Sequence, residues 1–285
     1  MQQVTVRVPA STSNLGPGFD CLGVALRIYS NVIVTCGAKS RLPPIARAAA
    51  DLFFQRTRCP QFSFSISVKG DVPSSRGLGG SAAVRLGVLL AMNFLSGNRL
   101  EKSSIFQLCA QLEGHPDNAA PAAFGGFTVV RGKNVQSFHV SPALSFVLLI
   151  PNFDVETLAA RKLLPSRVTH AAAIENLANA SAITAAFASG NYENLRGAFR
   201  DHLHQPYRKK LIPFLPHVIT AAEKAGALGA FLSGSGSTIA AVTLTNPRQV
   251  AEAMHRKIET HDARTVIVSA DNRGARLVQS PISSH

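Results

Sequence analysis

Three glycines within four positions, Gly77, Gly79 and Gly80, precede a run of small and apolar residues in the segment 73–83. Glycine lets a backbone turn tightly and approach a ligand closely. Where such a turn opens a helix, unpaired N–H groups and the helix dipole favour a bound anion, and the anion we expect here is a polyphosphate. The same pattern also fits a glycine-rich loop that caps an ordinary helix, because short motifs match by chance.

The glycine segment excludes two common nucleotide-binding motifs. It lacks Gly-Lys-Ser/Thr, so it is not a Walker A loop. A dinucleotide-binding turn needs an acidic residue about 20 positions further on, at the end of a strand. Glu101 lies near that position, but residues 95–103 are typical of a helix end and a loop.

Three further segments carry polar side chains that could bind a ligand or take part in catalysis. Residues 11–20 include Asn14 and Asp20, which suit an ammonium or a hydroxyl but are also ordinary turn residues. Residues 113–118 combine two carboxylates, an imidazole and an amide, so that they form either a Mg²⁺ site beside phosphate oxygens or an exposed loop. Residues 233–237 read Ser-Gly-Ser-Gly-Ser, which fits a close approach to phosphate and equally a hairpin turn.

The charge balance is strongly basic, with a net charge of +13. The basic residues are dispersed and no Trp is present, which favours a surface that attracts anionic substrates over nucleic-acid binding as the main function. Arg161 and Arg208 are candidates for bidentate contacts to carboxylate or phosphate, although most arginines are simply solvated.

Composition points to a globular chain with a large core, since 46% of the 285 residues are hydrophobic and 16% are charged. The four cysteines are scattered, which argues against disulfides or zinc and for a reducing compartment. The N-terminus has no signal-peptide pattern, and the most apolar run is too short to span a bilayer. We therefore expect a soluble cytoplasmic protein.

The elements that must position these residues follow from the hydrophobic pattern. Strands are predicted at 4–8, 22–28, 31–36, 62–68, 126–130, 136–140, 145–150, 227–232, 238–243 and 264–269, and 9–20 is predicted as a loop. Helices are predicted from Pro43 or Pro44 to about 56, at 81–95 and 102–112, two or three within 156–204, and at 213–225 and 247–260. The texture changes near Pro151, which predicts a nucleotide-binding domain over 1–150 and a domain over 151–285 that contributes to the substrate site.

Four segments in order, 9–23, 76–83, 113–122 and 232–236, resemble those of the homoserine kinase family. That family lies in the superfamily of galactokinase, homoserine kinase, mevalonate kinase and phosphomevalonate kinase. The resemblance implies a two-domain α+β fold, with an N-terminal half like ribosomal S5 domain 2 and a ferredoxin-like α+β C-terminal half. It also implies phosphorylation of the side-chain hydroxyl of L-homoserine, a step toward threonine, with ATP and Mg²⁺ as cofactors.

The resemblance further implies roles for individual residues. The substrate would be held by Asn14, Asp20, His115, Arg161 and Arg208, and the nucleotide by Pro73, Arg76, Gly77, Leu78, Gly79, Gly80, Ser81, Ala82, Ser235 and Gly236. The metal would be held by Ser81 and Glu113, and catalysis would depend on Asn118, Arg161 and Arg208. The family lacks an aspartate base near the hydroxyl, so alignment and electrostatics would supply the catalysis.

Three residues depart from the family pattern, one of them Ser237, where the family usually has Pro after the last glycine of 232–236. Gly80 stands where the family usually has Ser, which removes one hydroxyl from the cradle, and Arg85 lies in a helix stretch that is normally apolar. Two other functions therefore stay open: a superfamily kinase for another small hydroxylated metabolite, and a catalytically silent relative that binds a ligand or nucleic acid. The expected partner is a small-molecule substrate, with neither nucleic acid nor membrane, and a homodimer is left open.

Overall fold

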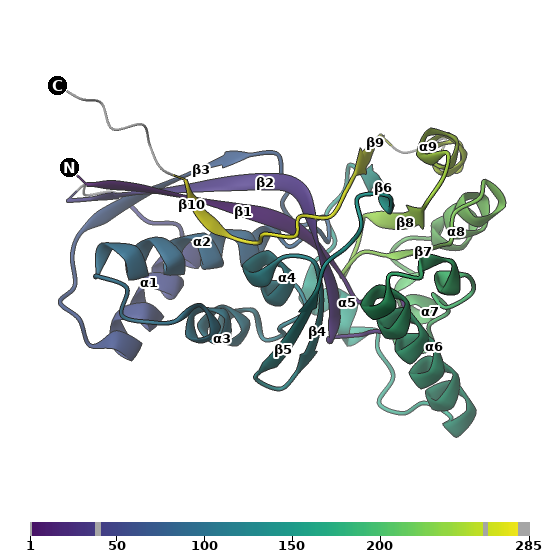
Figure 1. The fold of residues 1–285 in the computed structure, drawn as a ribbon, viewed down its shortest axis with the longest axis horizontal. Helices are drawn as coiled ribbons and strands as arrows, with labels where there is room; N and C mark the ends of the chain where they lie inside the picture. Colours follow the sequence, from purple (N-terminus) through teal and green to yellow (C-terminus); the bar gives the residue numbers. More distant parts are fainter. Residues whose placement is uncertain (1, 38–40, 259–261, 279–285) are drawn as a thin grey trace.

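The computed structural model of the chain describes residues 2–37, 41–258 and 262–278, which form two antiparallel sheets (Figure 1). The larger, six-stranded sheet consists of β1 (Gln3–Ser13), β2 (Leu22–Cys36), β3 (Phe64–Gly70), β4 (Phe127–Arg131), β5 (Asn134–Phe138) and β10 (Arg276–Val278). Its order is β10-β1-β2-β4-β5, and β3 also pairs with β2. The smaller, four-stranded sheet has the order β7-β8-β6-β9 and consists of β6 (Ser145–Pro151), β7 (Gly229–Leu232), β8 (Ile239–Thr243) and β9 (Ala263–Val268).

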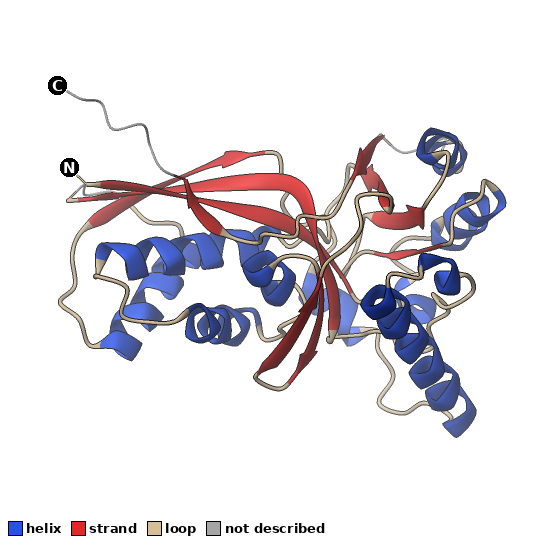
Figure 2. Ribbon diagram, viewed as in Figure 1, coloured by secondary structure: helices blue, strands red, loops and turns tan. Residues whose placement is uncertain are grey.

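Helices cover one face of the larger sheet (Figure 2). They are α1 (Pro44–Thr57), α2 (Gly80–Leu95), α3 (Lys102–Glu113) and α4 (Ala119–Phe124). The central helix, α2, packs on both β1 and β2. At Gly87 an added Cβ would lie only 2.4 Å from a methyl carbon of Val32, so the helix rests directly on the sheet. This close packing fixes the N-terminus of α2, where the glycine segment lies.

The remaining helices pack around the smaller sheet (Figure 1). They are α5 (Thr157–Lys162), α6 (His170–Ser189), the 3₁₀ turn η1 (Tyr192–Leu195), α7 (Gln205–Arg208), α8 (Leu215–Lys224) and α9 (Pro247–His255). One hydrophobic cluster joins the two halves, because Phe127 of β4 and Phe146 of β6 belong to it together. Phe127 also stacks on Phe187 of α6, with ring centroids 4.2 Å apart. Shared apolar burial therefore fixes how the two halves meet.

The strands differ from the predictions in three places. The expected loop 9–20 begins only after residue 13, because β1 continues through Ser11, Thr12 and Ser13. The two strands expected at 22–28 and 31–36 are one strand, β2, whose two ends pair with β4 and with β3. Strand β10 was not expected at all, since it is set by pairing with β1 across the whole chain.

Short helices were also missed, and one helix is shorter than expected. The segment after 113–118 was predicted to lead directly to a strand, but α4 intervenes, and α7 likewise was not predicted. The helix expected over 247–260 ends at His255, and residues 259–260 lie outside the described residues. The residues 233–237 form the loop of the β7–β8 hairpin.

The sheets do not divide at residue 150, because β6 belongs to the smaller sheet and β10 returns to the larger one. The division into domains over 1–150 and 151–285 stays a prediction, and its last residues, 279–285, lie outside the described chain. Among the described residues, no helix is both long enough and apolar enough to cross a membrane.

Candidate active site

A cavity of about 370 Å³ lies between the two halves of the molecule. Loops from both halves line it, from the β1–β2 connection, the glycine segment, the end of α3, the start of α5 and the β7–β8 hairpin. The residues are Ser13, Asn14, Phe19, Asp20, Ser75, Gly77, Gly79, Gly80, Ser81, Glu113, His115, Asp117, Asn118, Val155, Glu156, Thr157, Leu158, Arg161, Arg208, Gly234 and Ser235.

The glycine segment brings the N-terminus of α2 to this cavity. Gly79 is the N-cap in the left-handed region (φ 68°), and no side chain caps the helix. A Cβ on Gly79 would lie 2.1 Å from Ser11 Oγ, and one on Gly77 would lie 2.1 Å from the Ser233 carbonyl oxygen. Only glycine permits these approaches. The uncapped end of a 16-residue helix thus opens beside the cavity, an arrangement that favours an anion.

Glu113 is held by two residues of α2. Ser81 Oγ donates a hydrogen bond of 2.7 Å to Glu113 Oε2, and Arg85 pairs with Oε1. Ser81 and Arg85 are four residues apart, so they share one face of the helix. The Glu113 side chain is 5% exposed, which makes Arg85 important as the cation that compensates its charge.

The β1–β2 connection is tied to the hairpin loop by Asn14. Its Nδ2 donates to the Gly234 carbonyl (3.1 Å), while its Oδ1 accepts the Asp20 backbone N–H (3.0 Å). Asn14 and Asp20 both adopt positive φ, 71° and 58°. One buried amide therefore sets the path of the loop and presents the Asp20 carboxylate to the cavity.

Asp20 and Arg161 form a bidentate ion pair across the cavity, with N–O distances of 2.6 and 3.0 Å. The hydrogen bonds that Arg161 donates to Asp20 raise the pKa of Arg161 above its usual value despite partial burial. Both side chains stay about one third exposed, 35% for Asp20 and 31% for Arg161. The pair is therefore weak in free energy, about 0.2–1 kcal/mol for exposed pairs, and an incoming charged ligand has access to it.

Arg208 is a buried cation beside this pair. It is 2% exposed, and no carboxylate lies within ion-pair distance of it in the part of the chain that the structure describes. Its Nη1 donates to the Gly234 carbonyl (2.8 Å), and its Nε is buried without a partner. Burial, then repulsion by Arg161, lowers the pKa of Arg208 to about 10. An arginine in this condition favours an anion in the cavity.

His115 and Asn118 are fixed by neighbours. His115 Nδ1 lies 2.8 Å from Asp117 Oδ1; burial lowers the pKa of His115, but this contact outweighs it and the pKa is raised overall. The Asn118 amide accepts from Ser11 Oγ (2.9 Å) and donates to Ser13 Oγ (3.0 Å). These bonds explain why the polar end of β1 remains a strand.

Most of the expected site residues line this one cavity, and the structure leaves some elsewhere. Pro73 and Arg76 line a separate hollow, where Arg76 pairs with Asp154. Leu78 and Ala82 are fully buried in the core, and Gly236 does not line the cavity. A nucleotide role for these five residues stays a prediction.

Phe19 is a candidate that sequence reasoning missed. The guanidinium carbons of Arg161 and Arg208 lie 5.3 and 5.2 Å from its ring centroid, and the ring stacks on His204. Such cation–π contacts hold two cations side by side. The available signal was an aromatic residue directly before Asp20 in an otherwise polar, turn-rich loop. Asp117, Thr157 and Gly234 line the cavity and were likewise given no role.

Proteins of similar sequence are kinases. The chain matches the family models described as "GHMP kinases N terminal domain" over residues 44–126 and "GHMP kinases C terminal" over residues 180–260. It is 37% identical to the homoserine kinase of Caldicellulosiruptor bescii over 297 residues, covering 96% of each chain. It is 33% identical to that of Clostridium botulinum over 294 residues, covering 97% of this chain and 99% of the relative.

Solved structures give the same fold. The homoserine kinase from Cytophaga hutchinsonii superimposes with a TM-score of 0.89 at 25% identity, with 98% of each chain covered. The mevalonate kinase of Methanococcus jannaschii, at 13% identity, has a TM-score of 0.69 over 98% of this chain and 99% of its own, a likeness of fold alone. The expected two-domain α+β kinase fold is confirmed.

Replacing Gly79 with alanine should disable the anion site. The left-handed conformation costs about 1–2 kcal/mol for a residue with a Cβ, and the contact with Ser11 adds to it. Calorimetric titration with ADP should show at least about a tenfold loss of affinity, equal to ~1.4 kcal/mol. Gly80→Ala is the matched control, since its φ is not positive and its Cβ would meet nothing nearer than the Pro73 carbonyl oxygen, at 3.2 Å. Equal binding by both variants would contradict this account.

Replacing Arg85 with methionine should destabilise the protein through Glu113. Removing one partner of a largely buried pair leaves an uncompensated charge, and we expect a loss of about 1–3 kcal/mol in urea unfolding, below the fully buried case because Arg85 is 22% exposed. Adding Glu113→Gln to Arg85→Met should recover most of the loss, because no charge is then left unpaired. A double variant as unstable as the sum of the single ones would rule out this coupling.

Proposed function

Because the chain belongs to the homoserine kinase family of the GHMP kinases, we propose that it transfers the γ-phosphoryl group of ATP to the side-chain hydroxyl of L-homoserine. The observation that supports this proposal is that one cavity is lined both by the uncapped N-terminus of a helix and by a carboxylate with two arginines. The expected cytoplasmic location belongs to this proposal too.

The nucleotide's phosphates would lie at the N-terminus of α2. Backbone N–H groups from Gly79 to Ser81 replace the lysine of a Walker A loop, and the glycines leave the backbone bare. Phosphates placed there would share the cavity with Asp20 and Arg161. Transfer then depends on alignment and charge, as expected for a loose transition state.

Magnesium fits the residues present, since Ser81 and Glu113 offer adjacent oxygens 2.7 Å apart. One protein carboxylate and a hydroxyl, together with phosphate oxygens, is a set that Mg²⁺ commonly takes. When bound, the ion would neutralise charge on the phosphates. Arg85 occupies the other oxygen of Glu113, so it would orient this carboxylate toward the ion.

In this proposal the amino acid binds at the Asp20–Arg161 pair. In the free protein each group compensates the other. A zwitterion supplies both charges at once, because its ammonium can pair with Asp20 and its carboxylate with Arg161. A ligand with only one charge leaves one of the two groups without its partner, so the pair selects amino acids over simple alcohols.

Arg208 would act on the charge that develops during transfer. It is already desolvated and is held by the Gly234 carbonyl and the Phe19 ring. Its guanidinium therefore needs no reorganisation to stabilise negative oxygens on the substrate carboxylate or the phosphoryl group. No carboxylate competes for it within the described chain.

The direct test is ADP release by the purified protein with ATP, Mg²⁺ and L-homoserine. L-threonine, L-serine, mevalonate and galactose serve as competing acceptors. We expect turnover with homoserine to exceed that with each of the others by at least about tenfold in kcat/KM, or ~1.4 kcal/mol. A preference for mevalonate or galactose would assign another acceptor, and no ADP from any of them would defeat the kinase proposal.

The ion-pair account predicts a crossed pattern with two homoserine analogues. 3-Amino-1-propanol lacks the carboxylate, and 4-hydroxybutyrate lacks the ammonium. Arg161→Met should raise KM for homoserine at least about tenfold, as a charged hydrogen bond is worth about 1.5–3 kcal/mol, while KM for 3-amino-1-propanol changes little. Asp20→Asn should show the converse with 4-hydroxybutyrate. If both variants raise KM equally for homoserine and for both analogues, Asp20 and Arg161 do not recognise the ammonium and the carboxylate separately.

A further inference from the structure

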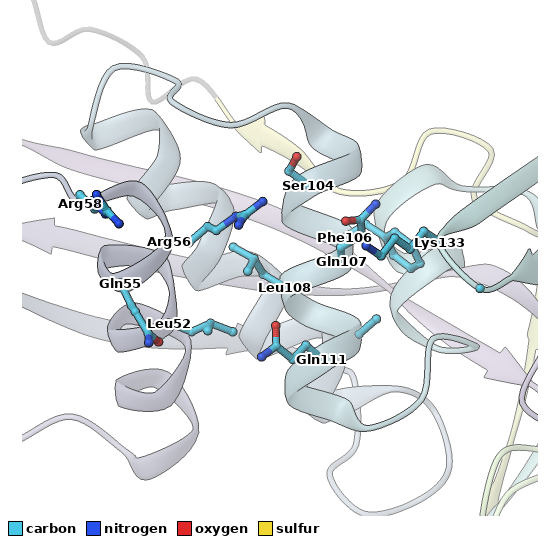
Figure 3. Close-up of a pocket in the computed structure, with 12 residues that line it drawn as sticks. Leu52, Gln55, Arg56, Arg58, Ser104, Phe106, Gln107, Leu108, Gln111 and Lys133 are labelled. Carbon is cyan, nitrogen blue, oxygen red and sulfur yellow. The ribbon is translucent and has the colours of Figure 1, made fainter.

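A second, larger cavity of about 640 Å³ lies on the outer side of the helical layer (Figure 3). It opens between α1, α3 and the turn that joins β4 to β5, and it shares no lining residue with the cavity between the two halves. Its lining residues are Leu52, Gln55, Arg56, Arg58, Ser104, Phe106, Gln107, Leu108, Ala110, Gln111, Gly132 and Lys133.

The rim of this cavity is cationic. Arg56 and Arg58 come from the end of α1 and Lys133 from the β4–β5 turn, and the lining includes no Asp or Glu. None of the three forms an ion pair with another residue that the structure describes. Figure 3 shows Arg56 extended from α1 toward Ser104 of α3. Like charges facing one hollow repel one another, and a bound anion would relieve that repulsion.

Neutral donors complete the rim, and the base is apolar. The side chains of Gln55, Gln107 and Gln111 supply amide N–H groups. Phe106 and Leu108 lie at the base, 1% and 6% exposed. A hollow with an apolar base and a few polar groups is the usual form of a small-molecule site, and its volume lies within the range of about 300–1,000 Å³ for such sites.

The same features argue against nucleic acid as the occupant. Phe106 is the sole aromatic residue of the lining and is almost fully covered, so it offers no face on which a base could stack. The cations surround a hollow and do not follow a ridge or stripe. Arginine in such a place suits the oxygens of a compact phosphate, which it binds with paired N–H groups.

We propose that this cavity is a binding site for a small organic phosphate, separate from the site of phosphoryl transfer. Arg56 and Lys133 bind the phosphate from opposite walls, and the apolar base receives the organic part. The inference does not rest on the proposed function, since it uses only the residues of this cavity.

Calorimetric titration with phenyl phosphate and with inorganic phosphate tests the proposal. The protein is first saturated with Mg²⁺ and a non-hydrolysable ATP analogue, and with L-homoserine, so that the other cavity is filled. The wild type should bind phenyl phosphate saturably and at least about threefold more tightly than inorganic phosphate, because the ring gains apolar burial. The double variant Arg56→Gln with Lys133→Gln should lower the affinity for phenyl phosphate at least about tenfold, because charged hydrogen bonds are lost.

Arg248→Gln with Lys224→Gln is the matched control, since both residues are exposed and the net charge changes equally. This control should bind phenyl phosphate as the wild type does, and circular dichroism checks that both double variants are folded. No saturable binding, or an equal loss in the control, would overturn the proposal in favour of diffuse attraction by a basic surface. Equal affinity for phenyl phosphate and inorganic phosphate would overturn the proposal that the apolar floor of the cavity binds an organic group.

Discussion

Close approach of the glycine segment to β1 and to the hairpin loop, at Gly79 and Gly77, is the constraint on which the candidate active-site cavity depends. At these points the glycine segment touches Ser11 of β1 and the Ser233 carbonyl of the hairpin loop with no room for a Cβ. Because α2 lies flat on β1 and β2, its uncapped end cannot move away from that contact. This part of the cavity is therefore shaped by main chain that packs closely on the sheet.

The second organising feature is how charge is balanced around that end. Glu113 is compensated by Arg85, and Asp20 by Arg161, whereas Arg208 contacts the Gly234 carbonyl, the His204 imidazole and the Phe19 ring and pairs with no carboxylate among the described residues. The first pair is largely buried and holds structure; the second is exposed enough to exchange partners with a ligand. Arg208, the third group, keeps a positive charge that no carboxylate of the described chain compensates, at a place where negative oxygens of a ligand would lie. The cavity therefore contains a structural ion pair, an ion pair that a ligand can replace, and one cation without a partner carboxylate in the part of the chain that the structure describes.

Sequence reasoning located the glycine segment, the acidic and amide residues of the two loops and both arginines, and the structure places these in one cavity. Sequence reasoning failed where the hydrogen-bond partners of polar residues lie far away in the sequence. Ser11 and Ser13 suggested a loop, yet each is bonded to Asn118, more than 100 residues away, so the strand continues. It also missed Phe19, whose value lies in the two cations above its ring, and β10, which needs β1 as a template.

The order of residue types along the chain determined most of the longer elements, the glycine segment and the family resemblance, because turn chemistry and hydrophobic period are local properties. Tertiary structure alone decided which charges pair. Arg85 could have faced solvent or a phosphate, and only the packing of α2 against α3 turns it to Glu113. Asp20 and Arg161, 141 residues apart, meet because a shared hydrophobic core joins the two halves. Coulombic contact depends on distance in space, which local sequence does not encode.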